Sequence, residues 1–139
     1  MERVGSMTKQ PILVTAAIIE KNGKYLITQR PQGTHNAGRW EFPGGKVNFG
    51  EDLKKCLERA IKEELGINIK AKDIFEYSSH VYGEDKHIVL LAFHCNFISG
   101  EIQKHEIADF AWVTVNEMKN FDITEADLPF IEALKHHRD

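Results

Sequence analysis

Two neighbouring carboxylates, Glu63 and Glu64, are the residues of this 139-residue chain best suited to chemistry. Adjacent carboxylates repel each other, and a hard divalent cation relieves that repulsion. Mg²⁺ prefers oxygen ligands, commonly one or two carboxylates together with water and substrate phosphate. On a helix, residues three and four apart share one surface, so both carboxylates would flank a patch with Ala60. The pair is therefore a candidate metal site, and a solvated acidic helix face is the alternative.

A helix from about Asp52 to Leu65 would carry these carboxylates. Apolar residues recur at intervals of four, a spacing typical of a helix with one core-facing side: Leu53, Leu57 and Ile61. Glu51 and Asp52 suit the positive end of the helix dipole. Gly66 stands where a left-handed residue commonly ends a helix.

A Pro-Gly-Gly turn precedes this helix. Residues 40–46 read WEFPGGK and pass from a short apolar strand into the turn. Glycine lets the backbone approach a ligand closely, so Gly44 and Gly45 could border the metal site. An ordinary turn is the alternative. Arg59 follows Glu51 by eight residues and could pair with it, although an exposed ion pair stabilises a protein little.

The segment from Gly45 to Ile67 closely resembles the Nudix box, the signature of the MutT-like pyrophosphohydrolases. Eight of the nine defined positions match, and the ninth, usually a glutamate, is Ala60. Weaker motifs extend the resemblance over nearly the whole chain beyond its first ten residues, and they favour the nucleoside triphosphate branch. These are Gln29-Arg30-Pro31, residues 38–42, Gly100, His105-Glu106, Trp112-Val113, Glu117 and residues 126–131.

This resemblance implies an α/β fold, the Nudix α/β/α sandwich with a central mixed β-sheet between helices. It implies one domain over residues 11–139 after a flexible segment at residues 1–10. The implied reaction is the hydrolysis of a nucleoside triphosphate, cytidine-type or oxidised, to a nucleoside monophosphate and pyrophosphate. Mg²⁺ is the implied cofactor, with Mn²⁺ as a substitute. An ADP-ribose or nucleotide-sugar pyrophosphatase, or a catalytically silent nucleotide-binding module, are the alternatives.

The resemblance also implies roles for individual residues. The metal ligands would be Glu63, Glu64, Glu106 and the carbonyl of Gly44. The framework of the box would consist of Gly45, Glu51, Arg59 and Gly66. The catalytic residues would be Glu63, Glu64, Glu106 and Arg59.

Three further residues are implied to bind substrate. Arg30 offers a fork of donors to a phosphate, or it pairs with a surface acid. Phe42 could stack on a base, as could Trp40 and Tyr82, although aromatic residues of a mixed sheet usually belong to the core. Asp127 would accept hydrogen bonds from amino-bearing base edges such as cytosine N4. It also suits the N-cap of the last helix, and both roles can hold at once.

Ala60 can neither bind a metal nor act as a general base, both of which the resemblance assigns to a glutamate at this position. Three explanations are compatible with it. The chain could be an engineered Glu-to-Ala variant. It could be a natural enzyme whose base lies elsewhere, with Glu106 as the first candidate. It could be a silent relative that binds nucleotide. Alanine is also simply the best helix former.

Composition agrees with one small enzyme. Hydrophobic residues make up 42% of the chain, which is enough for a core, and the net charge of −3 gives no basic field for duplex nucleic acid. The two cysteines, Cys56 and Cys95, form no C-x-x-C pair, so they predict buried thiols in a reducing compartment. No apolar run is long enough to span a membrane. We expect a cytoplasmic protein, monomeric or homodimeric, with a small-molecule nucleotide as its partner.

The remaining pattern predicts alternating strands and turns around this helix. Asn22-Gly23 is a strong hairpin signal, and Pro129 is tolerated in the first turn of a final helix. The predicted strands are Ile12–Glu20, Lys24–Gln29, Trp40–Phe42, parts of Ile69–Tyr82, Lys86–Ile98 and Phe110–Val113, and the final helix runs from about Ala126 to His136.

Overall fold

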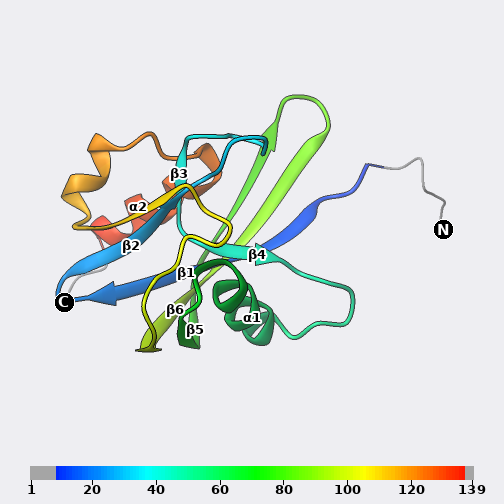
Figure 1. Cartoon of the computed structure of the whole chain (residues 1–139). Coiled ribbons are helices and arrows are strands. Elements are labelled where there is room, and N and C mark those ends of the chain that lie inside the picture. The colour runs from blue at the N-terminus through cyan, green and yellow to red at the C-terminus, as the bar shows by residue number, and fades with distance from the viewer. Residues whose placement is uncertain (1–8, 137–139) are drawn as a thin grey trace.

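The computed structural model of this chain describes residues 9–136 (Figure 1). Residues 1–8 of the predicted N-terminal segment lie outside the described residues. In chain order the elements are β1 (Ile12–Lys21), β2 (Lys24–Gln29), β3 (Trp40–Glu41), β4 (Gly44–Lys46), α1 (Leu53–Leu65), β5 (Asn68–Tyr82), β6 (Lys86–Ser99), β7 (Asp109–Val113), the 3-10 helices η1 (Asn116–Asn120) and η2 (Glu125–Asp127), and α2 (Leu128–Lys135).

The strands form one mixed sheet, which confirms the predicted architecture. Its main order is β3-β2-β1-β6-β5, while β4 pairs with β1 and β7 pairs with β2. The β1 and β6 strands run parallel, whereas β5 and β6 are antiparallel over most of their length. The β1–β2 hairpin turns at Asn22 and Gly23, both with positive φ, as the sequence predicts.

Each face of the sheet packs against one helix (Figure 1). Because successive side chains of a strand point to opposite faces, Ala17 and Ile19 of β1 belong to the cluster under α1. Ala16 and Ile18 belong to the cluster under α2. The two clusters hold the helices on opposite sides, so the fold is the expected α/β/α sandwich.

The first helix matches its prediction closely. Asp52 is the N-cap, and its side chain accepts a hydrogen bond from the Lys55 N–H at 3.1 Å. Gly66 ends the helix with a φ of 73°. Leu57 and Ile61 are fully buried, whereas Leu53 is only partly buried. Glu51 and Asp52 precede the first turn of α1. Their acidic stabilisation of the helix start therefore comes from the capping hydrogen bond of Asp52 and not from charges within the first turn.

Three local features differ from the sequence prediction. The strand expected at Trp40–Phe42 ends at Glu41, and a second short strand, β4, follows the Phe42-Pro43 step. The expected final helix begins with a 3-10 turn, and its α-helical part starts only at Leu128, with Pro129 in its first turn. The 3-10 helix η1 was not predicted. None of the helices in residues 9–136 is long and apolar enough to cross a membrane.

Candidate active site

A cavity of about 260 Å³ opens beside the Pro-Gly-Gly turn. Part of its wall comes from β1, the segment after β2 and the β3–β4 region. The rest comes from the end of α1, the turn end of β5 and β6, and η2. Among the lining residues are seven that the sequence singled out: Arg30, Phe42, Gly44, Gly45, Glu64, Tyr82 and Asp127. The predicted residues Glu51, Arg59, Glu63, Gly66 and Glu106 do not line it.

The turn and helix α1 approach each other very closely at one point. A Cβ built on Gly45 would overlap with the Cβ of Ala60, and a Cβ on Gly44 would overlap with the carbonyl group of Thr15. Only glycine fits at both positions. Ala60 is 2% exposed, so it packs against the turn and is not on the open patch beside Glu63 and Glu64 that the helical spacing predicted.

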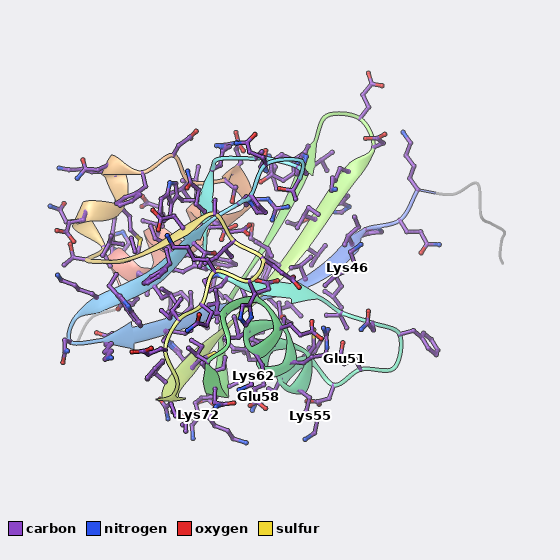
Figure 2. All side chains as sticks on the ribbon, viewed as in Figure 1. Lys46, Glu51, Lys55, Glu58, Lys62 and Lys72 are labelled. Carbon is purple, nitrogen blue, oxygen red and sulfur yellow. The ribbon has the colours of Figure 1, made fainter. Side chains whose placement is uncertain are left out.

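Arg59 joins the loop after β4 to the helix, as the sequence predicted. Its Nε donates to Glu51 Oε2 at 2.6 Å and its Nη2 donates to Glu51 Oε1 at 3.0 Å. The same Nη2 reaches the carbonyl oxygen of Lys46 at 3.3 Å. Figure 2 shows Lys46 at the end of β4 and Glu51 on the loop that follows, beside α1. The hydrogen bonds from Arg59 lower the pKa of Glu51 to about 2.

Glu63 and Glu64 have different surroundings. The Glu63 side chain is 55% exposed and its Oε1 accepts from Arg59 Nη1 at 3.0 Å. Glu64 is half-buried and lines the cavity. Burial, followed by the charges of Glu41 and Glu106, raises the pKa of Glu64 to about 8. Glu64 is thus the carboxylate that most needs a positive partner.

Glu106 lies next to Glu64, although 42 positions separate them in the chain. The Glu106 N–H donates to the carbonyl oxygen of Glu64 at 3.4 Å, which brings the loop between β6 and β7 against the end of α1. Its side chain is exposed. The structure therefore brings Glu63, Glu64 and Glu106 to one region, while their roles as ligands stay predictions.

The donor set suits a hard cation. Within residues 9–136, no three His, Cys, Asp or Glu side chains are arranged closely enough to hold a metal by themselves. Mg²⁺ needs no such cage, because waters and substrate phosphates complete its shell. The repelling carboxylates around Glu64 suit a hard divalent cation such as Mg²⁺ or Mn²⁺ and not a thiolate-bound metal.

Glu41 is a cavity residue that the sequence analysis missed. Its Oε2 accepts from Arg30 Nη1 at 3.0 Å, and burial raises the pKa of Glu41. The Arg30 Nε also donates to the carbonyl of His35. Arg30 is therefore held against an acid, but inside the cavity and not on the outer surface. The sequence signal that could have identified Glu41 is its position as a single acidic residue between the aromatic residues Trp40 and Phe42.

Asp127 is almost fully buried, with 3% of its surface exposed. Its Oδ2 accepts from the Phe42 N–H at 2.9 Å, and its Oδ1 accepts from the Thr124 hydroxyl at 2.8 Å. Asp127 stands at the N-cap position of α2, as the sequence predicted, but its side chain makes no capping hydrogen bond to the helix. Burial, followed by the charge of Glu41, raises the pKa of Asp127 to about 7.

The aromatic candidates separate into two groups. Phe42 and Tyr82 line the cavity. Phe42 packs on Phe130 with ring centroids 6.2 Å apart, and the Tyr82 hydroxyl accepts from the Ala126 N–H at 2.9 Å. Trp40 instead packs edge-on against Phe121 at 4.9 Å and does not line the cavity. A stacking role for Trp40 is therefore not supported.

The cavity also has a cationic side that the sequence analysis did not assign. Lys86, at the start of β6, lines it together with His35 and Arg30. Burial lowers the pKa of His35, and the charges of Lys86 and Arg30 lower it further. The cavity therefore holds both cations and carboxylates, which suits a ligand that carries both phosphates and amino groups.

Comparison with known proteins gives consistent matches over the whole described fold. The family model described as the NUDIX domain matches residues 9–134. The chain is 38% identical to the CTP pyrophosphohydrolase of Escherichia coli (strain K12), over 88% of this chain and 90% of that protein. It is 30% identical to putative 8-oxo-dGTP diphosphatase 2 of Mycobacterium tuberculosis (strain CDC 1551 / Oshkosh), over 88% and 86%. The crystal structure of a MutT protein from Methanosarcina mazei Go1 has a TM-score of 0.85 at 26% identity, covering 96% of this chain and 100% of that one.

Proposed function

Since this chain belongs to the Nudix family of hydrolases, which act on phosphoanhydride bonds, we propose that it hydrolyses a nucleoside triphosphate to a nucleoside monophosphate and pyrophosphate. The proposed substrate is cytidine-type or oxidised, in keeping with the names of the two relatives. The observation that carries the proposal is the cavity itself. It combines Glu64 and the glycine turn with Arg30 and with a buried base-reading candidate, Asp127.

The nucleobase would lie against Asp127 and the rings of Phe42 and Tyr82. In its ionised form Asp127 is only an acceptor, so it selects edges that carry N–H groups, such as cytosine N4 or guanine N1 and N2. Its hydrogen bonds to Thr124 and to the Phe42 N–H hold the carboxylate in one orientation. A fixed acceptor in a buried site discriminates better than a mobile one, because a wrong base edge leaves it unpaired.

The phosphates would lie toward Glu64 and the glycine turn. A divalent cation would be held by Glu64, Glu63 and Glu106 and by the Gly44 carbonyl. When bound, it would neutralise phosphate charge and lower the pKa of a nearby water. Arg30, held by Glu41, would donate to a phosphate oxygen, and Arg59 would keep the loop and helix in register. Positioning and charge stabilisation carry most of phosphoryl transfer, so no covalent intermediate is needed.

Glu106 is the proposed general base, because Ala60 cannot take a proton. Its exposed carboxylate stands beside Glu64 and would accept a proton as water attacks phosphorus and pyrophosphate leaves. Glu106→Gln should lower kcat by about 10²-fold or more. Glu101→Gln, another exposed acid of the same loop, is the matched control and should leave kcat unchanged.

The main test is a substrate panel in Mg²⁺. Release of pyrophosphate from CTP, dCTP or 8-oxo-dGTP supports the proposal. Hydrolysis confined to ADP-ribose or a nucleotide sugar, with release of a sugar phosphate, would favour the alternative activity. Tight Mg²⁺-dependent nucleotide binding without turnover, even in Ala60→Glu, would favour a silent binding module.

Ala60→Glu should raise turnover at least about tenfold. Ala60 lies against Gly45 and one helical turn before Glu64, so a carboxylate at this position would leave the helix where the turn and the acidic residues meet. Ala133→Glu on α2 is a control for a helical Ala-to-Glu change away from the cavity. An unchanged rate in Ala60→Glu would show that the base is located elsewhere.

A further inference from the structure

The outer edge of β5 carries an unpaired segment. The β5 strand is at the end of the strand order, and within residues 9–136 its one strand partner is β6. Near its start, the Ala71 N–H donates to Glu58 Oε2 of α1 at 2.9 Å, so the helix occupies that part of the edge. The part from Tyr77 to Tyr82 lies farther from α1, toward the turn end of the hairpin (Figure 1).

This part of the edge lacks the features that usually protect an edge strand. Bulges, prolines and charged side chains normally block pairing with another chain. The irregularities of β5 all occur between Asn68 and Glu76, and pairing with β6 is regular from Glu76 to Tyr82. Residues 77–82 read YSSHVY and contain neither proline nor a lysine, arginine or carboxylate.

An exposed apolar surface accompanies this edge. Of the seven large hydrophobic residues exposed in the described chain, four lie on the α1-side face of β1, β6 and β5. The strand register places them there: Leu13 is opposite Val89, Tyr77 opposite Leu91, Ile74 opposite Phe93 and Val81 opposite His87. Tyr77 is 67% exposed and Val81 is 55% exposed. An apolar surface next to an open edge is typical of an interaction site.

We propose that this edge pairs antiparallel with the same edge of a second copy, which gives a two-fold symmetric dimer with a continuous sheet. A two-fold axis perpendicular to the sheet keeps the α1-side faces of both copies on the same side. Opposed residues of the two β5 strands must then belong to the same face, which holds only if the axis passes through a residue and not between two residues. This pairing satisfies the open backbone groups of both copies at once. Tyr77 and Val81 of the two copies then form one apolar patch along the junction.

Side-chain chemistry selects the register centred on Ser78. In this register Glu76 lies opposite His80 of the second copy, an acceptor facing a ring N–H donor, and symmetry makes this pair twice. Tyr77 lies diagonally next to Tyr77 and Val81 of the second copy. A centre at His80 would instead place Glu76 opposite Glu84, which is repulsive. The strand is therefore complementary to itself in the register centred on Ser78, which favours a second copy over an unrelated partner.

The first test measures molar mass by light scattering and sedimentation from low to several hundred micromolar protein. The wild-type chain should show a concentration-dependent dimer. Tyr77→Lys/Val81→Lys should weaken dimerisation by at least about tenfold, since four like charges then meet at the junction. Ile98→Lys, at an exposed apolar position outside the edge, should dimerise as the wild type does. Tyr77 and Val81 do not line the cavity, so their replacement should not affect hydrolysis directly. Thermal unfolding and nucleotide hydrolysis therefore verify that the double variant is folded.

A cross-linking test addresses the register. Opposed residues of antiparallel strands have Cα atoms about 4.5–5.5 Å apart, within the range of a disulfide. An equimolar mixture of Glu76→Cys and His80→Cys chains should form a disulfide-linked dimer under mild oxidation. Neither variant alone should form this dimer, because in the proposed register position 76 of one copy is four residues along the strand from position 76 of the other, and the same holds for position 80. The native cysteines, Cys56 and Cys95, are buried.

Three results would overturn the proposal. The first is a monomer at every concentration. The second is a dimer that survives Tyr77→Lys/Val81→Lys. The third is cross-linking of either single-cysteine variant by itself with no gain in the mixture. The proposal does not depend on the proposed activity, so a chain without turnover could still dimerise through β5.

Discussion

Gly45 provides the most direct test of how the site is built. Its φ is not positive, so alanine is compatible with the backbone and any effect of Gly45→Ala is steric. The added Cβ would lie closer than 3.0 Å to the Cβ of Ala60, whereas carbon atoms prefer about 3.5–4.0 Å. The turn and α1 would therefore have to separate by roughly 1 Å or more.

That separation is resisted on both sides of the contact. Leu57 and Ile61 anchor α1 in the core with no exposed surface, and Arg59 ties the helix to Glu51 and to the Lys46 carbonyl. Overpacking of this kind typically costs about 1–3 kcal/mol of unfolding free energy. Because Glu64 lies on the displaced helix, kcat should also fall, by up to about 10²-fold for a 1 Å misplacement.

A double-mutant cycle isolates the contact. Ala60→Gly removes the opposing Cβ and alone should cost about 1 kcal/mol through helix propensity. In Gly45→Ala/Ala60→Gly the overlap is gone, so the two changes should be less harmful together than their sum, by at least about 1 kcal/mol. Urea unfolding with an unchanged m-value gives the free energies. Ala133→Gly in place of Ala60→Gly should combine additively with Gly45→Ala. Additivity of the Gly45–Ala60 pair would refute the reasoning.

Three further perturbations test the carboxylates. Millimolar Mg²⁺ should raise the Tm measured in a thermal scan, because it relieves the repulsion around Glu64. Glu64→Gln should reduce that rise. A wild-type Tm that does not change with Mg²⁺ would count against the metal site. The folded-state pKa of Asp127, about 7, is above its ordinary value of 3.8, so the native state binds the extra proton and stability should fall as pH rises from about 4 to about 7. Each pKa unit corresponds to about 1.4 kcal/mol. Urea unfolding of Asp127→Asn should show a smaller decline than the wild type, and Glu64, whose raised pKa acts in the same direction, accounts for a decline that remains. For Glu51, whose pKa is lowered to about 2, the sign is opposite: its stabilisation is present above about pH 4.5 and is lost as pH falls toward 2. Glu51→Gln should remove this part of the acid sensitivity, and an unchanged acid unfolding profile would contradict it.

The sequence alone determined those parts of the site that depend on spacing within one segment. The bounds of α1, its Gly66 end and the Glu51–Arg59 pair were all predicted, whereas Asp52 was predicted only as an acid at the helix start. Each depends on residues fewer than ten positions apart, and the helix repeat fixes their relative directions whatever surrounds them.

Tertiary structure decided which distant groups meet and which become buried. Arg30, Glu41 and Asp127 lie on three separate segments. The pairing of β2 with β3 brings the first two together, and the hydrogen bond from the Phe42 N–H to Asp127 adds the third. The helical spacing predicted Ala60 on an open patch, but the turn packs against it. Asp127 looked like a helix cap, yet its side chain bonds to the Phe42 N–H, 85 positions away. Such outcomes follow from long-range packing, and local periodicity carries no information about them because it describes only neighbours along the chain.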